Sequence, residues 1–265
     1  MSTLIRGSVW GMTRVAVVGA AGRMGQTIAS ALADQPDIAV SVLIDVRAPE
    51  LLFGARHVSS LDEIDEGTID VMVDFSTVET TRKTATWAAA RGIPMIIGTT
   101  GFTDADFAQW RGDFENGHLL VAANFAIGAV LAQRFAAEAA RYFERVEIIE
   151  YHHDRKVDAP SGTALETARK IAAARATSGQ TPISEPTTRE PSAGSRGADI
   201  DGIRIHAVRM PAMTAHQEVI FGGVGEGLTL RHDAYDRSSF AAGVILAVRN
   251  IRRFPGLTVG LDPLL

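Results

Sequence analysis

The most reactive side chains in the sequence gather between residues 150 and 163, in the stretch EYHHDRKVDAPSGT. His152 and His153 stand side by side, and Lys156 follows them closely. A histidine can donate a proton near neutral pH, and a lysine can bind a carboxylate or serve as an acid. These side chains therefore predict a site that binds a small anion and moves a proton.

A helix predicted from about Thr163 to Ala176 supports that interpretation. Gly162 stands just before it, and Thr163 with Glu166 fits the pattern of a capping box. The free backbone N–H groups at the N-terminus of a helix attract anions. We therefore expect the start of this helix, with histidine and lysine beside it, to hold a carboxylate of the substrate.

A metal site and a purely structural role are the other interpretations of the two histidines. Adjacent residues of a strand point to opposite faces, so His152 and His153 are poorly placed to share one ion. The sequence also has no cysteine and no HExxH spacing, and we expect no metal. A lone histidine is most often structural. Two histidines close to a lysine and a helix start favour chemistry instead.

A glycine-rich loop follows the first predicted strand, Arg14 to Val18. It reads GAAGRMG over residues 19 to 25 and leads into an amphipathic helix predicted at residues 23 to 33. Glycines permit a tight turn and let backbone N–H groups approach a pyrophosphate at the helix start. The spacing is GxxGxxG rather than GxGxxG, but its place between a strand and a helix favours a dinucleotide site.

The second predicted strand ends at Asp45, twenty residues after Gly25, where a ribose-binding acid is expected. Its carboxylate could accept a hydrogen bond from the 2′-hydroxyl of NADH. Arg23 and Arg47 could instead pair with the 2′-phosphate of NADPH. These residues predict a nicotinamide dinucleotide and leave the choice between NADH and NADPH open.

Small and hydroxyl-bearing residues end two further predicted strands, at residues 75 to 77 and 98 to 101. Such residues let the ribose and nicotinamide of a cofactor lie close to the backbone. Taken singly, either segment is more often a simple helix cap. Residues 122 to 125 end the fifth predicted strand. Asn124 could bond a carboxamide or cap the next helix.

The elements that would position these residues alternate short β-branched runs with Ala-rich helical stretches. This alternation is typical of βαβ units and a parallel sheet. The predicted strands are 14–18, 39–44, 70–75, 94–98 and 118–122, and the predicted helices are 23–33, 78–91 and 104–113. The first half therefore predicts a Rossmann-like, doubly wound α/β domain, whose ligands bind at the carboxyl ends of the strands.

After Asn124 the pattern changes to that of an α+β domain with an open mixed sheet. A helix is predicted at 127–142, a strand at 146–151, and a long surface loop at 177–199. Strands at 203–208, 216–221 and 228–232 predict an antiparallel meander with four glycines in its last turn. A final helix from Ser238 to Arg253 is predicted to stop at Pro255 and Gly256.

Composition excludes several classes of protein. The chain has 265 residues, 26 Lys plus Arg and 31 Asp plus Glu, and a net charge of −5, which gives no general reason to bind nucleic acid or an anionic membrane. Without cysteine it has no disulfide and no thiolate nucleophile. No apolar run is long enough for a signal peptide or a membrane span. We expect a cytoplasmic protein without nucleic-acid or membrane partners, in which residues 1–12 are an extension.

Several stretches match one known family: VAVVGAAGRMG, VDFS, IIGTTGF, AANFAIGAVL, EIIEYHHDRKVDAPSGTA and a carboxyl-terminal part that begins HAVRMPAMTAHQE. In these, nearly the whole chain resembles the 4-hydroxy-tetrahydrodipicolinate reductases, also called dihydrodipicolinate reductases, and especially their actinobacterial members. The HHxxKxDAPSGTA pattern is the most specific part of the resemblance. Tyr151 departs from it, because a smaller or aliphatic residue is common before the two histidines.

The resemblance implies hydride transfer from NADH or NADPH to a cyclic imine with two carboxylates, in diaminopimelate and lysine biosynthesis. It implies that His152 donates the proton and that Lys156 is its catalytic partner. His153, Gly162 and Thr163 would hold the carboxylates of the substrate. The implied cofactor residues are Gly19, Ala20, Ala21, Gly22, Arg23, Met24, Asp45, Gly98, Thr99, Thr100, Ala122, Ala123, Asn124 and Phe125.

The resemblance also implies two domains and a homotetramer. The dinucleotide domain would comprise residues 13–126, completed by 238–265, and the substrate-binding and tetramerisation domain residues 127–237. Two other functions remain as alternatives to this reductase. Another two-domain dehydrogenase of a small carboxylate would not require HHxxKxDAPSGTA. A non-catalytic dinucleotide sensor would be expected to lose His152 or Lys156, and both are present.

Overall fold

The computed structural model describes residues 11–183 and 192–265. These residues form two compact units. Unit 1 runs to Phe125 and resumes at Phe240–Leu265, and unit 2 is Ala126–Ser239. Most of the predicted extension, residues 1–10, and part of the predicted loop, residues 184–191, lie outside the described residues.

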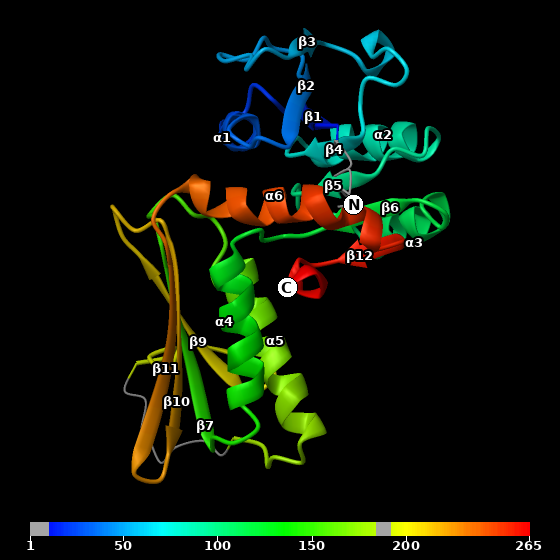
Figure 1. The fold of residues 1–265 in the computed structure, drawn as a ribbon. Coiled ribbons are helices and arrows are strands. Elements are labelled where there is room, and N and C mark those ends of the chain that lie inside the picture. Colours follow the sequence, from blue (N-terminus) through cyan, green and yellow to red (C-terminus); the bar gives the residue numbers. More distant parts are fainter. Residues whose placement is uncertain (1–10, 184–191) are drawn as a thin grey trace, which may run out of the picture. The chain divides into compact units, whose positions relative to one another are not determined.

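Unit 1 is a parallel sheet of seven strands in the order β12-β6-β5-β4-β1-β2-β3 (Figure 1). The strands are β1 Thr13–Val18, β2 Ile38–Ile44, β3 Arg56–Val58, β4 Val71–Asp74, β5 Met95–Ile97, β6 His118–Val121 and β12 Gly256–Val259. The helices are α1 Arg23–Ala33, α2 Val78–Ala89, α3 Asp104–Asp113 and α6 Ala241–Asn250. This is the predicted doubly wound fold, and its strand order places the ends of β1, β2, β4, β5 and β6 along one edge.

The central strands of unit 1 contain continuous apolar runs because both faces of the sheet are covered. All four residues from Val15 to Val18 are buried, and so is every residue of β4 and β5. Such continuous apolar runs are typical of parallel strands packed between two helical layers. The core of this unit therefore lies on both sides of the sheet.

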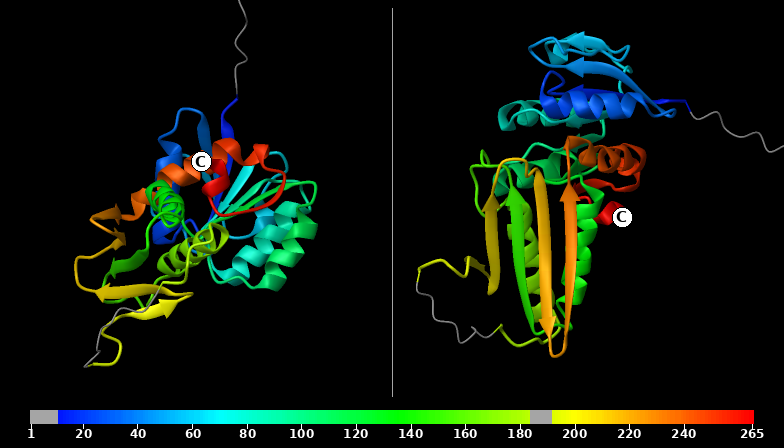
Figure 2. Two further views of the ribbon diagram at one scale, coloured as in Figure 1. Left: turned by 90° about the horizontal axis from the view of Figure 1, so that it is seen from below. Right: turned by 90° about the vertical axis from the view of Figure 1, so that its left-hand side faces the viewer.

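Unit 2 is a mixed sheet of five strands in the order β11-β10-β7-β9-β8, with two helices on one face. Its strands are β7 Arg145–His152, β8 Ala198–Ile200, β9 Ile203–Arg209, β10 Ala215–Gly223 and β11 Glu226–Ala234. The helices α4 Ile127–Ala139 and α5 Gly162–Thr177 lie behind the strands in the right-hand view of Figure 2. Alternate residues of β7 are buried, Val146, Ile148 and Glu150, which is the pattern of a sheet covered on one side.

The predicted meander is wrong in one respect: β9 does not pair with β10, because β7 lies between them. β7 pairs parallel with β9 and antiparallel with β10, and only β10 and β11 form a hairpin. The hairpin turn is also tighter than predicted. Gly223 pairs with Glu226, so Gly222 and Gly223 belong to β10, and Gly227 belongs to β11.

Three strands of the structure were not predicted from the sequence, and all of them are short. β3, β8 and β12 have three, three and four residues, and each is an edge strand. The last helix also begins later than expected. A 3-10 turn, Arg237–Phe240, precedes α6, and Phe240 rather than Ser238 stands in the N-cap position. The backbone N–H of Ser238 donates to the Asp236 carboxylate at 2.7 Å.

No helix in the described part of the chain combines the length and apolar character needed to cross a membrane.

α6 completes unit 1 by packing closely against the segment that ends at Phe125. A Cβ atom on Gly243 would lie 2.0 Å from the Phe125 carbonyl oxygen and 2.9 Å from Leu261 Cδ2. The absence of a side chain at Gly243 therefore allows the helix to approach the backbone. Gly112 in α3 offers a contrast, because a Cβ atom there would meet nothing within 4 Å.

We expect Gly243→Ala to lower the melting temperature by about 5 °C, since overpacking a core costs about 1–3 kcal/mol. Gly112→Ala is the matched control and should leave the melting temperature unchanged or raise it slightly, because alanine is the better helix former. Circular dichroism melting of both variants makes the comparison. Equal melting temperatures would contradict the packing of α6 described here.

Candidate active site

The predicted cofactor residues of unit 1 lie on segments that follow strands of one sheet, apart from Arg23 and Met24, which are the first residues of α1. Gly19–Gly22 separate β1 from α1, and Asp45 follows β2. The segment 98–100 follows β5, and 122–125 follows β6. These strands are parallel members of one sheet, so the structure brings all of these segments to its carboxyl edge.

Asp45 is tied directly to the glycine loop. Its Oδ2 accepts a hydrogen bond from the Ala21 backbone N–H at 3.0 Å, and its Oδ1 accepts one from the Arg47 N–H at 3.0 Å. The Arg47 guanidinium lies 4.0 Å from the same carboxylate. The acid predicted to bind the ribose and the loop predicted to bind the pyrophosphate are therefore adjacent.

The glycines of the loop are required by close backbone contacts. Gly19 has a φ of +76°, and a Cβ atom there would lie 2.6 Å from the Phe75 carbonyl oxygen. A Cβ atom on Gly25 would lie 2.1 Å from the Gly19 carbonyl oxygen. Among the described residues, no side chain caps α1 and no acid lies in its first turn. A narrow loop that leads to an uncapped helix start fits the pyrophosphate of a dinucleotide.

The buried Asp74 carboxylate at the end of β4 fixes the neighbouring segments of this edge. It accepts hydrogen bonds from the hydroxyls of Ser76 at 2.7 Å, Thr81 at 3.0 Å and Thr99 at 3.2 Å. Thr84 donates to its other oxygen at 2.7 Å. Because the hydroxyl groups of Ser76 and Thr99 donate their hydrogens to Asp74, their oxygens remain as hydrogen-bond acceptors for a ligand. Asp74 was missed in the sequence, although the VDFS stretch contains it.

The segment after β6 contributes a buried ring. Phe125 is buried and packs edge to face against Phe75, with 5.8 Å between the ring centres. Ala122 is buried, Ala123 is exposed and Asn124 is partly buried. Of the predicted residues here, Ala123 and Asn124 are therefore the ones with surface that a ligand can reach.

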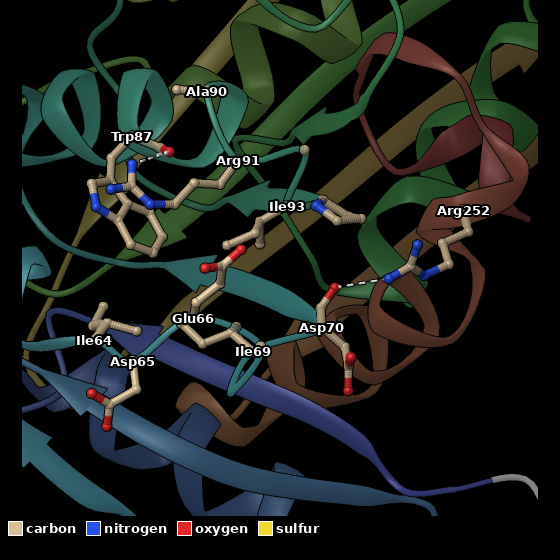
Figure 3. Close-up of a pocket in the computed structure, with 13 residues that line it drawn as sticks. Ile64, Asp65, Glu66, Ile69, Asp70, Trp87, Ala90, Arg91, Ile93 and Arg252 are labelled. Atoms are coloured by element: carbon tan, nitrogen blue, oxygen red, sulfur yellow. Dashed lines mark hydrogen bonds between the residues drawn. The ribbon is translucent and has the colours of Figure 1, made fainter.

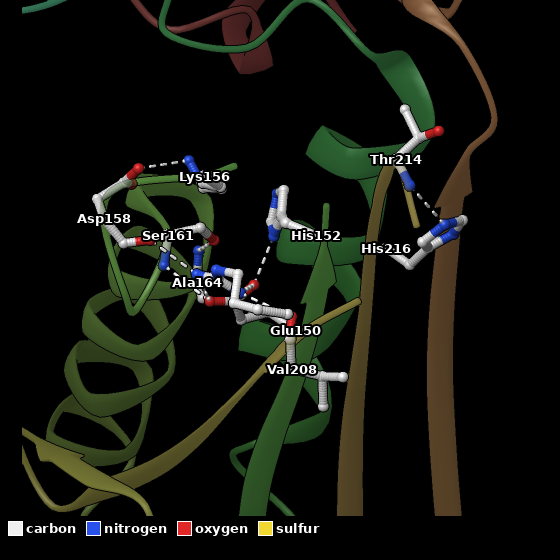
Figure 4. Close-up of polar contacts among 10 residues, drawn as sticks. Glu150, His152, Lys156, Asp158, Ser161, Ala164, Val208, Thr214 and His216 are labelled. Carbon is white, nitrogen blue, oxygen red and sulfur yellow. Dashed lines mark hydrogen bonds and ion pairs between the residues drawn. The ribbon is translucent and has the colours of Figure 1, made fainter. Parts of the chain in front are cut away.

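In unit 2 the predicted catalytic histidine ends β7 and bonds to a carboxylate. His152 Nδ1 lies 2.5 Å from Glu150 Oε2 (Figure 4). Residues two apart in a strand share a face, so Glu150 and His152 both point to the side that the helices cover. His153 follows the strand, and its buried Nδ1 is without a hydrogen-bond partner in the part of the chain that the structure describes.

Glu150 is the centre of a group that we call the Glu150 cluster: Glu150, His152, Ser161 and Arg209. The Glu150 side chain has no exposed surface. Arg209 donates to both carboxylate oxygens at 2.8 Å, and the Ser161 backbone N–H donates to Oε1 at 3.1 Å. The cluster therefore joins the end of β7, the end of β9 and the start of α5.

The charge of Glu150 is held in place by these contacts. Burial by itself would raise the pKa of the Glu150 carboxyl, but the hydrogen bonds from His152 and Arg209 outweigh it and lower the pKa below its ordinary value. Glu150 therefore stays a carboxylate at neutral pH. A carboxylate can only accept hydrogen bonds, so the hydrogen between Glu150 and His152 belongs to His152 Nδ1.

Lys156 lies on the loop between β7 and α5 and is linked to the same cluster. Its Nζ donates to Asp158 Oδ1 at 2.7 Å, and its backbone N–H donates to the His153 carbonyl at 3.1 Å. Arg209 donates to the Asp158 carbonyl at 2.7 Å. The hydrogen bond from Lys156 lowers the pKa of the Asp158 carboxyl. Lysine, histidines and helix start are thus brought together in unit 2, as the sequence predicted.

The predicted capping box at Thr163 and Glu166 is wrong. Ser161 caps α5, and its Oγ accepts a hydrogen bond from the Ala164 N–H at 3.3 Å. Serine is the stronger N-cap residue, so the helix begins at Gly162 and Thr163 lies within its first turn. The predicted carboxylate-binding residues still lie at the start of the helix.

A large cavity of about 850 Å³ lies elsewhere in unit 1. Figure 3 shows Trp87, Arg91 and Arg252 along it, together with Glu66 and Asp70, which precedes β4. Asp70 and Pro94 mark the amino ends of β4 and β5, the edge opposite to the cofactor segments. None of the predicted site residues lines this cavity.

Glu150 and Arg209, like Asp74, were missed by sequence reasoning. Glu150 could have been found, because it precedes His152 by two residues in a predicted strand and must share its face. Arg209 gave no such signal. It stands 59 residues from Glu150, and only the parallel pairing of β7 with β9 brings the two together.

Comparison with known proteins agrees with the fold and with the resemblance in sequence. A family model described as "Dihydrodipicolinate reductase, N-terminus" matches residues 13–125, and one described as "Dihydrodipicolinate reductase, C-terminus" matches residues 128–265. A 4-hydroxy-tetrahydrodipicolinate reductase of Nocardia farcinica is 46% identical over 255 residues, covering 95% of this chain and 98% of the relative. One from Corynebacterium efficiens is 45% identical over 253 residues, covering 94% and 97%.

A solved structure extends the comparison to three dimensions. The dipicolinate-bound dihydrodipicolinate reductase from Paenisporosarcina sp. TG-14 is 37% identical and has a TM-score of 0.86, covering 96% of this chain and 100% of that one. A myo-inositol dehydrogenase from Corynebacterium glutamicum, with 20% identity and a TM-score of 0.57 over 92% of this chain and 90% of that one, shares the fold alone. Two family models that together span both units, with close relatives along nearly the whole length, establish that this chain belongs to the dihydrodipicolinate reductase family.

Proposed function

We propose that this chain reduces 4-hydroxy-tetrahydrodipicolinate to tetrahydrodipicolinate with NADH or NADPH, in diaminopimelate and lysine biosynthesis. The family membership supports the reaction, as does the dipicolinate bound to the Paenisporosarcina reductase. The observation that carries it furthest is the Glu150 cluster, because it sets a histidine with a hydrogen-bonded Nδ1 beside the start of a helix. In the overall reaction water is lost, a hydride adds to one ring carbon, and the resulting enamine takes up a proton.

The carboxyl edge of the sheet in unit 1 is the proposed cofactor site. When bound there, the reduced nicotinamide supplies the hydride. The uncapped start of α1 would hold the pyrophosphate, and Asp45 would accept from a ribose hydroxyl. Ala20, Ala122 and Phe125 are buried and would shape this site from behind rather than touch the cofactor. The residues proposed to form the cofactor site are Gly19, Ala20, Ala21, Gly22, Arg23, Met24, Asp45, Gly98, Thr99, Thr100, Ala122, Ala123, Asn124 and Phe125.

His152 is the proposed proton donor. Glu150 occupies its Nδ1, so the proton would leave from Nε2. Lys156 would assist by placing a positive charge against the dicarboxylate substrate. His153, with its buried Nδ1 lacking a partner among the described residues, would hold a carboxylate together with Gly162 and Thr163 at the start of α5.

His152→Gln should lower turnover about a hundredfold or more, which is the usual effect of losing a general acid. The substrate is generated by the preceding synthase, and turnover is read from the nicotinamide absorbance. The affinity for NADH, measured by fluorescence, is the control and should not change. Undiminished turnover in the variant would contradict the proposed role of His152. If the wild type oxidised neither NADH nor NADPH, the proposed reaction itself would be contradicted.

Asp45→Ala tests the ribose contact. We expect kcat/KM with NADH to fall about tenfold and kcat/KM with NADPH to fall less, because a carboxylate that binds a 2′-hydroxyl also repels a 2′-phosphate. The ratio of the two values is the relevant measure, since loss of the bond to the Ala21 N–H affects both cofactors alike. A relative gain for NADH would contradict the proposed role.

We place the enzyme in the cytoplasm and propose that it is a homotetramer. The proposed assembly surface is the sheet face of unit 2 opposite α4 and α5 (Figure 2). It carries Ile149, Tyr151 and Val208, which are partly exposed, and Ile220, which is 38% exposed. Apolar side chains on an uncovered sheet face favour pairing with another copy.

Light scattering coupled to size-exclusion chromatography should give a mass of four chains of 28.3 kDa each. Ile220→Lys should shift that mass downwards, because it places a charge within the proposed surface. Retention of the tetramer by this variant would show that the subunits meet elsewhere, and a wild-type monomer would contradict the proposal.

A further inference from the structure

Glu150 is a buried acid that the proposed proton transfer does not use directly. Its side chain has no exposed surface, and its lowered pKa keeps it ionised, so it is not itself the source of the proton. It nevertheless makes a 2.5 Å contact with the ring of the proposed donor. Burying a charge costs free energy that only its ion-pair and hydrogen-bond partners can offset.

We propose that Glu150 is a positioning residue that fixes the ring orientation and the tautomer of His152, so that only Nε2 can deliver the proton. This inference rests on the proposed role of His152 as proton donor. With Nδ1–H bonded to Glu150, the imidazolium loses its proton from Nε2. The neutral ring that remains keeps the same Nδ1–H bond, so the contact is preserved before and after the transfer.

Arg209 and Ser161 orient the carboxylate for this purpose. Arg209 bonds both oxygens at 2.8 Å, and the Ser161 N–H takes a further position on Oε1 at 3.1 Å. Oε1 thus accepts the hydrogen bond from the Ser161 N–H at the start of α5, and Oε2 accepts the one from His152. The same carboxylate therefore links the orientation of the proton donor to the start of α5.

Glu150→Gln is the first test. Oε1 has two fixed donors, Arg209 and the Ser161 N–H, whereas Oε2 has one from Arg209 and one from the His152 ring, which can change its tautomer. The amide oxygen should therefore take the Oε1 position, and the amide nitrogen should face His152 Nδ1. The ring would then carry its hydrogen on Nε2 alone, and a neutral imidazole is a weak acid. We expect kcat to fall about tenfold or more, with the KM for substrate nearly unchanged. The solvent deuterium isotope effect on kcat should increase, because proton transfer becomes limiting.

Glu150→Asp is the second variant, in case the first does not fold. It keeps a carboxylate for Arg209 but shortens the side chain by one methylene, so it should lose its reach to His152. We expect it to fold, to bind NADH normally and to show a lowered kcat. Wild-type kcat in this variant would overturn the proposal, since the contact with Nδ1 would then not matter.

Glu147→Gln is the matched control. Glu147 lies on the same strand but on the opposite face, and it pairs with a histidine and an arginine, His206 at 2.8 Å and Arg196. Removing its charge should leave the solvent isotope effect at the wild-type value. The mass of each variant is checked by light scattering, since Glu147 lies on the proposed assembly surface.

A double variant separates this inference from the proposed function. If Glu150 acts through His152, then His152→Gln with Glu150→Gln should be no slower than His152→Gln alone. Additive losses, or a raised KM with unchanged kcat in Glu150→Gln, would show that Glu150 only holds the helix start. Normal turnover in His152→Gln alone would instead defeat the proposed function.

Discussion

One buried carboxylate organises the chemistry of unit 2. Glu150 receives hydrogen bonds from a strand end, from a second strand and from the start of a helix, through His152, Arg209 and Ser161. Removing one partner of a buried ion pair typically costs about 3–5 kcal/mol, because the remaining charge is left without compensation. The positions of the histidine and of the helix start are therefore coupled by a single side chain.

Unit 1 also contains a buried carboxylate that holds neighbouring segments together. Asp74 is completely buried and holds four hydroxyl groups, two of which, on Ser76 and Thr99, belong to segments at the carboxyl edge of the sheet. In both units, a buried acid at the end of a strand fixes the loops that carry the proposed ligand-binding residues. Glu150 has a cation as its partner, whereas these hydroxyl partners of Asp74 are neutral.

The sequence predicted the fold class and most of the site because those features are local. The glycine loop and Asp45 follow strands of unit 1, and the order of its βαβ units brings them together. In unit 2, the two histidines and the helix start lie within one short stretch of sequence. The missed features depend on pairing between distant segments. The short edge strands β3, β8 and β12 have too few residues to show a periodic pattern, and the contact of Arg209 with Glu150 depends on the position of β9 beside β7. Ser161 replaced Thr163 as the helix cap because two neighbouring hydroxyl residues compete for one position.

In the proposed mechanism, His152 keeps its Nδ1 hydrogen, bonded to Glu150, and offers Nε2 to the substrate. Neutron diffraction from a deuterium-exchanged crystal locates these hydrogens directly. We expect a deuteron on His152 Nδ1 directed at Glu150 Oε2, and none on either oxygen of Glu150. A deuteron on the carboxyl group, or a bare Nδ1 with the only deuteron on Nε2, would contradict it.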